Sequence, residues 1–143
     1  MLTTKIFNYL QILILSFLIQ NGAYAITASD EEEIISVVNA QLQAFHDDDF
    51  EKAYSYASPT IKTIFSDYKK FRDMVVGQYQ AVYRPKSINF GNVTTQGGTT
   101  FLEVYLVAPD GIFVTAIYTM QQQEDDSWLI NGCFLNQAKS DQI

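Results

Sequence analysis

The spacing of apolar side chains changes once along this chain, near Tyr79, and that change constrains the fold more than any other feature. Before it, apolar residues recur every three or four positions, as in Ile34, Val38, Leu42 and Phe45, which is the spacing of one helix face. After it, apolar residues alternate with others in short runs rich in β-branched and aromatic side chains. Helices followed by strands predict an α+β domain with the helices packed on one face of an antiparallel sheet.

The first predicted helix covers about residues 30 to 46. Ser29 and Glu32 have the spacing of a capping box, in which a hydroxyl and a carboxylate satisfy free amide groups at the start of a helix. Asp48 is the predicted cap of a second, short helix with Phe50 and Ala53 on its buried face. The three aspartates at 47–49 lack the alternating spacing of an EF-hand loop, so we interpret them as caps and not as a calcium site.

Two further helices are predicted before the change of period. Ser58 is the expected cap of the third, with Pro59 in the first helical position, where its missing amide hydrogen costs nothing. Ser66 or Asp67 is the expected cap of the fourth helix, and Gly77 is placed to end it.

Four strands are predicted after the change of period, at residues 82–93, 99–107, 112–121 and 128–135. The intervening turns are short enough for antiparallel hairpins. In strand 99–107 both alternating sets of side chains are apolar, apart from Glu103. A sheet that faces water on one side should alternate more cleanly. The sheet is therefore expected to curve around a lined cavity, to pair with a second copy in a homodimer, or to do both.

The N-terminus has the three parts of a secretory signal. Lys5 supplies positive charge, residues 6–19 are largely apolar, and Ala23 and Ala25 form a small-residue cleavage site. No cysteine lies near this site for lipid attachment. We therefore expect cleavage after Ala25, a periplasmic or secreted protein without a membrane anchor, and a single domain at 26–143 with a polar tail from about residue 136.

Charge and cysteine content exclude several classes of protein. The chain has 16 acidic and 9 basic side chains, for a net charge of −7, which argues against nucleic-acid and membrane-surface partners. Cys133 is the single cysteine, so no intramolecular disulfide can form, and its apolar surroundings in sequence favour a buried thiol. The sequence has no phosphate-binding glycine loop, nucleophile elbow or Cys/His ligand spacing, so we predict no metal and no other cofactor.

Three segments of the chain follow a known pattern: Asp48-Asp49-Phe50, Tyr83-Arg84-Pro85, and Trp128 followed by Asn131-Gly132-Cys133. They resemble the domain-of-unknown-function 4864 family of small exported proteobacterial proteins. That family is similar to the cone-shaped domains named after nuclear transport factor 2, in which helices pack into the concave side of a bent sheet. The resemblance implies this fold for nearly the whole chain after residue 25. It implies no single activity, because the wider superfamily contains isomerases, cyclases, dehydratases and non-catalytic binding domains.

Aromatic and basic side chains supply the candidate ligand-binding residues. Arg84, held by the rigid Pro85 and close in sequence to Tyr79 and Tyr83, can present two donors to a carboxylate or phosphate. The alternative is that Arg84 pairs with an acid of its own chain while its stem covers core aromatics.

Three aromatic residues in the strands are further candidates for lining a cavity: Tyr105, Tyr118 and Trp128. The alternative for them is an ordinary place in the core.

Catalysis in a cone fold needs an acid or imidazole inside an apolar cavity. Glu103 and His46 are the weak candidates, with Tyr83 or Tyr105 as a donor. We predict instead a non-catalytic domain that holds a small apolar or anionic ligand, or docks on a protein partner. The alternatives are a cone-fold isomerase or cyclase that transfers a proton on a small carbonyl substrate, and a structural subunit of an envelope assembly.

Overall fold

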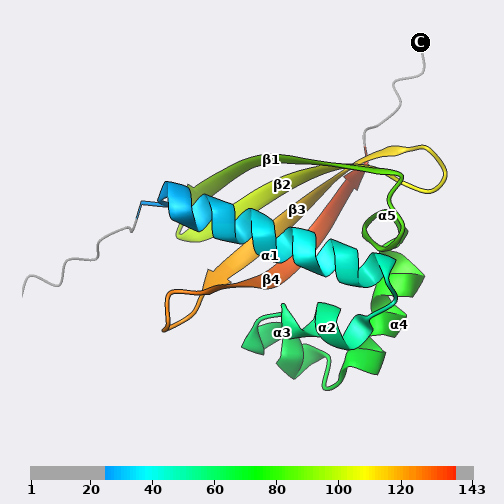
Figure 1. Cartoon of the computed structure of the whole chain (residues 1–143), viewed down its shortest axis with the longest axis horizontal. Coiled ribbons are helices and arrows are strands. Elements are labelled where there is room, and N and C mark those ends of the chain that lie inside the picture. Colours follow the sequence, from blue (N-terminus) through cyan, green and yellow to red (C-terminus); the bar gives the residue numbers. More distant parts are fainter. Residues whose placement is uncertain (1–24, 138–143) are drawn as a thin grey trace, which may run out of the picture.

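The computed structural model describes residues 25–137 and has helices first and strands afterwards (Figure 1). The helices are α1 (Ala28–His46), α2 (Phe50–Ser55), α3 (Pro59–Ile64), α4 (Tyr68–Gln78) and α5 (Gln80–Tyr83). The strands are β1 (Ser87–Gln96), β2 (Thr99–Val107), β3 (Phe113–Gln122) and β4 (Trp128–Gln137). Residues 1–24 of the predicted signal peptide lie outside the described part of the chain.

The four strands form one open antiparallel sheet in the order β1-β2-β3-β4. The helices lie on one face of it, with α1 running along the sheet and α2, α3 and α4 grouped near the β4 edge (Figure 1). The predicted α+β class is therefore confirmed, and the open, one-sided arrangement is consistent with a cone-like fold. No helix within residues 25–137 is long and apolar enough to span a membrane.

The alternation of side chains in β2 decides which face of the sheet is buried. Leu102, Val104 and Leu106 are almost inaccessible and belong to the same core as Ile34 and Val38 of α1. The other alternating set faces away from the helices, so its apolar members form an outer sheet face.

The capping box of α1 lies two residues earlier than the sequence suggested. Thr27 is the N-cap: its hydroxyl accepts from the Asp30 amide at 3.1 Å, and the Asp30 carboxylate accepts from the Thr27 amide at 2.9 Å. The prediction of Ser29 with Glu32 was wrong. Because the Asp30 carboxylate also accepts from the Trp128 indole nitrogen at 3.0 Å, a contact with β4 favours the observed pair.

The other caps confirm the predictions at Ser58 and Asp67 and correct the one at Asp48. The Ser58 hydroxyl and the Asp67 carboxylate accept from amides in the first turns of α3 and α4. Asp49, not Asp48, caps α2, accepting from the Lys52 amide at 3.1 Å. Asp48 adopts a left-handed conformation with φ of 57°, which frees its carboxylate for other contacts.

The change from helix to strand comes later than predicted. Helix α4 continues through Gly77 to Gln78, so the prediction that Gly77 ends it was wrong. Residues 82–86 do not join the sheet, because α5 buries Ala81 and Val82 in the core and β1 begins only at Ser87.

Strand β4 also runs further than predicted. Asn136 and Gln137 pair with Thr115 and Val114 of β3, so the polar tail cannot begin at residue 136.

Strand β4 forms one edge of the sheet, and the segment between α2 and α3 pairs with it. The Ser58 amide donates to the Ile130 carbonyl at 2.8 Å, and the Ile130 amide donates to the Tyr56 carbonyl at 2.9 Å. The Ser58 hydroxyl also donates to the Asn131 side chain at 2.8 Å, where β4 bulges. These bonds hold α3 beside β4 and leave a space between the helices and the strand.

Candidate functional site

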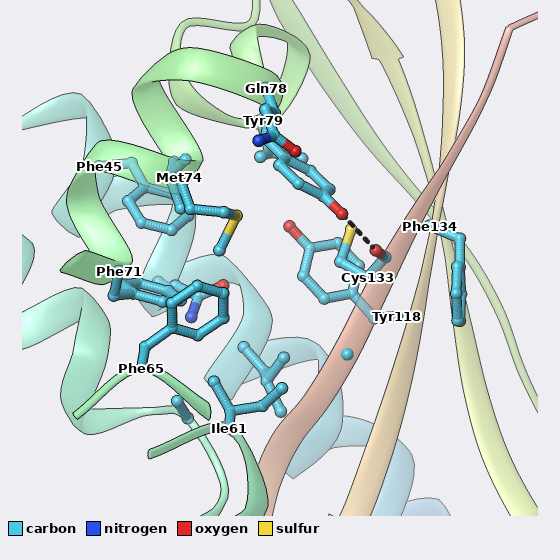
Figure 2. Close-up of a pocket in the computed structure, with 16 residues that line it drawn as sticks. Phe45, Ile61, Phe65, Phe71, Met74, Gln78, Tyr79, Tyr118, Cys133 and Phe134 are labelled. Carbon is cyan, nitrogen blue, oxygen red and sulfur yellow. Dashed lines mark hydrogen bonds between the residues drawn. The ribbon is translucent and has the colours of Figure 1, made fainter. Parts of the chain in front are cut away.

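A pocket of about 320 Å³ lies between the helices and strand β4 (Figure 2). Its lining comes from α1, α3, α4, α5, β3 and β4 and is mostly aliphatic and aromatic: Gln41, Phe45, Ala57, Ile61, Phe65, Phe71, Met74, Val75, Gln78, Tyr79, Val82, Tyr118, Ile130, Gly132, Cys133 and Phe134. Figure 2 shows the ring of Phe134 on the far side of the β4 ribbon from the other labelled side chains. A concave apolar space with a few polar groups is the usual form of a small-molecule site.

A cluster of phenylalanines forms the helical wall of the pocket. Phe71 of α4 is buried, and its ring lies 6.0 Å from the rings of both Phe45 and Phe65, measured between centroids. Met74, one turn further along α4, extends toward the centre of the pocket in Figure 2. The wall is therefore a packed aromatic layer to which one flexible side chain has been added.

The polar groups at the pocket are few and uncharged. The Gln41 amide nitrogen donates to the Ala53 carbonyl at 3.2 Å, and the Tyr79 hydroxyl donates to the Cys133 carbonyl at 3.3 Å. Within residues 25–137, no lining side chain of this pocket is acidic, basic or an imidazole. The pocket thus offers hydrogen bonds but no counter-charge.

The Tyr118 hydroxyl is the exceptional group. Tyr118 is 1% exposed, and within the described part of the chain its buried hydroxyl has no hydrogen-bond partner. Figure 2 shows this hydroxyl beside the thiol of Cys133, near Tyr79. The Cys133 thiol is close enough to affect the pKa of Tyr118, but thiol sulfur is a weak acceptor and the contact lacks the geometry of a hydrogen bond. Buried side-chain polar atoms are usually hydrogen-bonded, so an exception of this kind needs an explanation.

Burial also fixes the protonation of both groups. It raises the pKa of the Tyr118 hydroxyl well above its usual value and that of the Cys133 thiol to about 12. Both groups are therefore neutral near pH 7, and Cys133 is a poor nucleophile.

Two of the predicted ligand-binding residues, Tyr79 and Tyr118, line the pocket. Two others lie elsewhere. The Trp128 indole is buried and bonded to Asp30, and Tyr105 is exposed on the outer sheet face, where its hydroxyl donates to Glu103 at 2.9 Å.

The remaining two candidates, Tyr83 and Arg84, form a polar cluster at the C-terminus of α1. The Arg84 guanidinium donates to the carbonyls of Phe45 and His46 at 2.9 and 2.8 Å, and to the Asp48 carboxylate at 2.8 Å. It lies 4.2 Å from the centroid of the Tyr83 ring, whose hydroxyl donates to the same carboxylate at 2.7 Å. The guanidinium donors predicted for a bound anion thus bind the protein's own oxygens.

Hydrogen bonding within this cluster changes two pKa values. The bond from the Tyr83 hydroxyl, followed by the charge of Arg84, holds the pKa of the Asp48 carboxyl below its usual value. The same bond raises the pKa of Tyr83.

The two weak catalytic candidates do not line the pocket. Glu103 lies on the outer sheet face, and His46 is exposed at the end of α1, where its ring nitrogen lies 3.2 Å from the Asp47 carboxylate. No group of three or more His, Cys, Asp or Glu side chains within residues 25–137 could hold a metal ion.

None of the residues in the helical wall of the pocket is among the candidates predicted from the sequence. Phe65 and Met74 belong to the apolar stripes of predicted helices, and Cys133 is predicted only as a buried thiol. A 3.6-residue stripe shows which face of a helix avoids water, but it does not distinguish a packed face from one that borders a cavity.

The outer sheet face carries a second apolar surface. Phe113 of β3 and Phe134 of β4 are 70% and 63% exposed, and Tyr105 of β2 is exposed on the same face. The two faces of the sheet are thus both partly apolar, as expected from strand 99–107, and the pocket described above lies on the side of the helices.

Comparison with known proteins gives one match. Residues 27–143 match the family described as "Domain of unknown function (DUF4864)". No curated protein and no solved structure matches the chain.

Proposed function

Because the chain belongs to the DUF4864 family, described only as a domain of unknown function, its role must be argued from its own site, and we propose that it is a non-catalytic domain that binds a small, largely apolar ligand. The observation that carries this proposal is the pocket between the helices and β4, with the unpartnered Tyr118 hydroxyl in its wall. A pocket of about 320 Å³ is at the lower end of the range for small-molecule sites, which favours a compact ligand.

The polar groups of the pocket support binding over proton transfer. A base in an apolar cavity would need a carboxylate or an imidazole within reach of the substrate. Glu103 and His46 both lie away from the pocket, and the neutral Tyr118 and Cys133 are poor bases. We therefore do not propose the isomerase or cyclase alternative for this site.

We also propose export to the periplasm or beyond, with cleavage after Ala25, and pairing of two copies through the outer sheet face. The charge and apolar pattern of residues 1–25 supports the first proposal. The exposed Phe113 and Phe134 support the second. The cone-like arrangement of helices on an open sheet supports the resemblance to domains of the nuclear transport factor 2 type.

Native mass spectrometry of the protein purified from its own compartment tests these proposals together. We expect a polypeptide mass that begins at Ile26, and a complex heavier by the mass of one small molecule per chain. A bare polypeptide that also fails to bind any neutral apolar probe would contradict the ligand-binding proposal, and a bare monomer would contradict pairing of two copies.

A further inference from the structure

We infer that the ligand is an uncharged, mainly apolar molecule with a carbonyl-type oxygen that accepts a hydrogen bond from the Tyr118 hydroxyl. This inference rests on the proposed ligand-binding function and specifies the chemical class of the ligand. It follows from the charge of the pocket lining, from the unpartnered hydroxyl, and from the poor fit of the site for water.

The uncharged lining of the pocket argues against a ligand that carries a carboxylate, a phosphate or an ammonium group. Among the lining residues within 25–137, no side chain carries a formal charge that could pair with an ion. The Arg84 guanidinium, which could have received an anion, is bonded to Asp48 and to the end of α1. An ion in this pocket would lose its hydration without gaining a counter-charge, which is strongly unfavourable.

The Tyr118 hydroxyl selects for an acceptor. Burial raises the pKa of this hydroxyl well above its usual value, so it stays protonated and can donate a hydrogen bond to an oxygen. A ligand carbonyl would satisfy a donor that otherwise remains without a partner. The Tyr79 hydroxyl lies nearby in Figure 2, and its bond to the Cys133 carbonyl is long, at 3.3 Å, so it can turn to the same ligand oxygen.

Water is a poorer occupant than such a ligand. A buried water molecule typically makes about three hydrogen bonds. The pocket lining is chiefly aliphatic and aromatic, and the Gln41 amide and the Tyr79 hydroxyl in it already donate to main-chain carbonyls. A carbonyl needs only the acceptor contact at this point, and the rest of the molecule can cover the apolar wall.

Three probes of matched size test the inference by equilibrium titration of the full exported domain. Acetylnaphthalene has the carbonyl, ethylnaphthalene replaces it with hydrocarbon, and naphthoate replaces it with a charge. We expect acetylnaphthalene to bind most tightly and naphthoate most weakly. Tyr118→Phe should weaken acetylnaphthalene about tenfold, the loss expected for one good hydrogen bond, and leave ethylnaphthalene unchanged.

Tyr105→Phe is the matched control. It removes a tyrosine hydroxyl from the outer sheet face, away from the pocket, so it should leave the affinity for all three probes unchanged. If Tyr118→Phe does not fold, the order of affinities in the wild-type protein still decides between the three chemical classes.

The outcomes separate this inference from the proposed function. Tight binding of naphthoate, or an equal effect of Tyr118→Phe on acetylnaphthalene and ethylnaphthalene, would overturn the inference and leave the ligand-binding function standing. Failure of all three probes to bind, together with a bare polypeptide in native mass spectrometry, would overturn both.

Discussion

Two tyrosine hydroxyls in this molecule differ in both burial and hydrogen bonding. The Tyr83 hydroxyl, near the surface, donates to Asp48 at 2.7 Å, and the Arg84 guanidinium lies 3.2 Å from it. The Tyr118 hydroxyl, in the core, has no hydrogen-bond partner within residues 25–137 and lies beside only the weakly accepting Cys133 thiol. The more expensive place for an unpaired hydroxyl is the buried one, so the arrangement is the reverse of what stability alone would select. The fold explains the partners of the first hydroxyl, and the ligand that we propose would supply an acceptor for the second.

The contrast extends to the residues around each tyrosine. At the polar cluster, Arg84 joins α5 to the last turn of α1 through main-chain oxygens, as a structural crosslink does. At the pocket, the neighbours of Tyr118 are apolar or weakly polar and add little to its hydrogen bonding. Substitutions in the first region should therefore change stability, and substitutions in the second should change ligand affinity.

Removing Arg84 should have the largest effect on stability. Arg84→Ala deletes four hydrogen bonds from a charged donor and leaves the carbonyls of Phe45 and His46 without that donor. We expect a loss of about 2 kcal/mol in the free energy of unfolding, measured by urea denaturation.

Arg72→Ala is the control for Arg84→Ala. Arg72 also forms an ion pair at 2.8 Å, with Asp73, but both side chains are well exposed on α4. An exposed pair of this kind should contribute less than about 1 kcal/mol. Equal effects of the two arginine substitutions would show that the polar cluster does not hold the end of α1.

Substitution of the two tyrosines by phenylalanine should have the next largest effects on the free energy of unfolding, and the two effects should differ in direction. Tyr83→Phe removes a satisfied hydrogen bond and should lower the free energy of unfolding by about 1 kcal/mol. Tyr118→Phe removes a buried hydroxyl that has no partner, so the ligand-free protein should be as stable as wild type or more stable by about 1 kcal/mol. Calorimetric or urea unfolding of both variants, purified without ligand, measures the difference. A similar loss in both variants would mean that Tyr118 has a partner in the free protein, and the contrast would fail.

The sequence predicted this contrast only in part. Periodicity gave the order of helices and strands, and the caps at Ser58 and Asp67 follow from local chemistry that needs no distant partner. The cap of α1 could not be chosen locally, because Thr27 with Asp30 and Ser29 with Glu32 have the same spacing and a contact with Trp128 distinguishes them.

The site was predictable to a similar extent. Tyr79 and Tyr118 were recognised as candidates from their residue type, but the partners of a side chain depend on tertiary packing. Nothing local to Arg84 indicates that Asp48 and two carbonyls lie within its reach, or that the Tyr118 hydroxyl lies beside no ordinary acceptor.

The smallest expected effect is the pH dependence of the polar cluster. The Tyr83 bond, and then the Arg84 charge, hold the pKa of Asp48 below its ordinary value of 3.8. A carboxyl with a lowered pKa in the folded state adds stability above its unfolded pKa and loses that contribution as the pH falls through the folded value. Asp48→Asn keeps a residue that tolerates φ of 57° and removes the titration.

The stability difference between wild type and Asp48→Asn should therefore be constant near neutral pH and should shrink as the pH falls below about 3.8, the ordinary aspartate value. Thermal unfolding at a series of pH values measures it. In a Tyr83→Phe background the pH dependence should weaken, because the strongest cause of the lowered pKa is gone. If the pH dependence persists unchanged, the charge of Arg84 and not the hydrogen bond from Tyr83 lowers the pKa of Asp48. The Tyr83 hydroxyl would then be bonded less strongly than the structure indicates, and its contrast with the Tyr118 hydroxyl would be smaller.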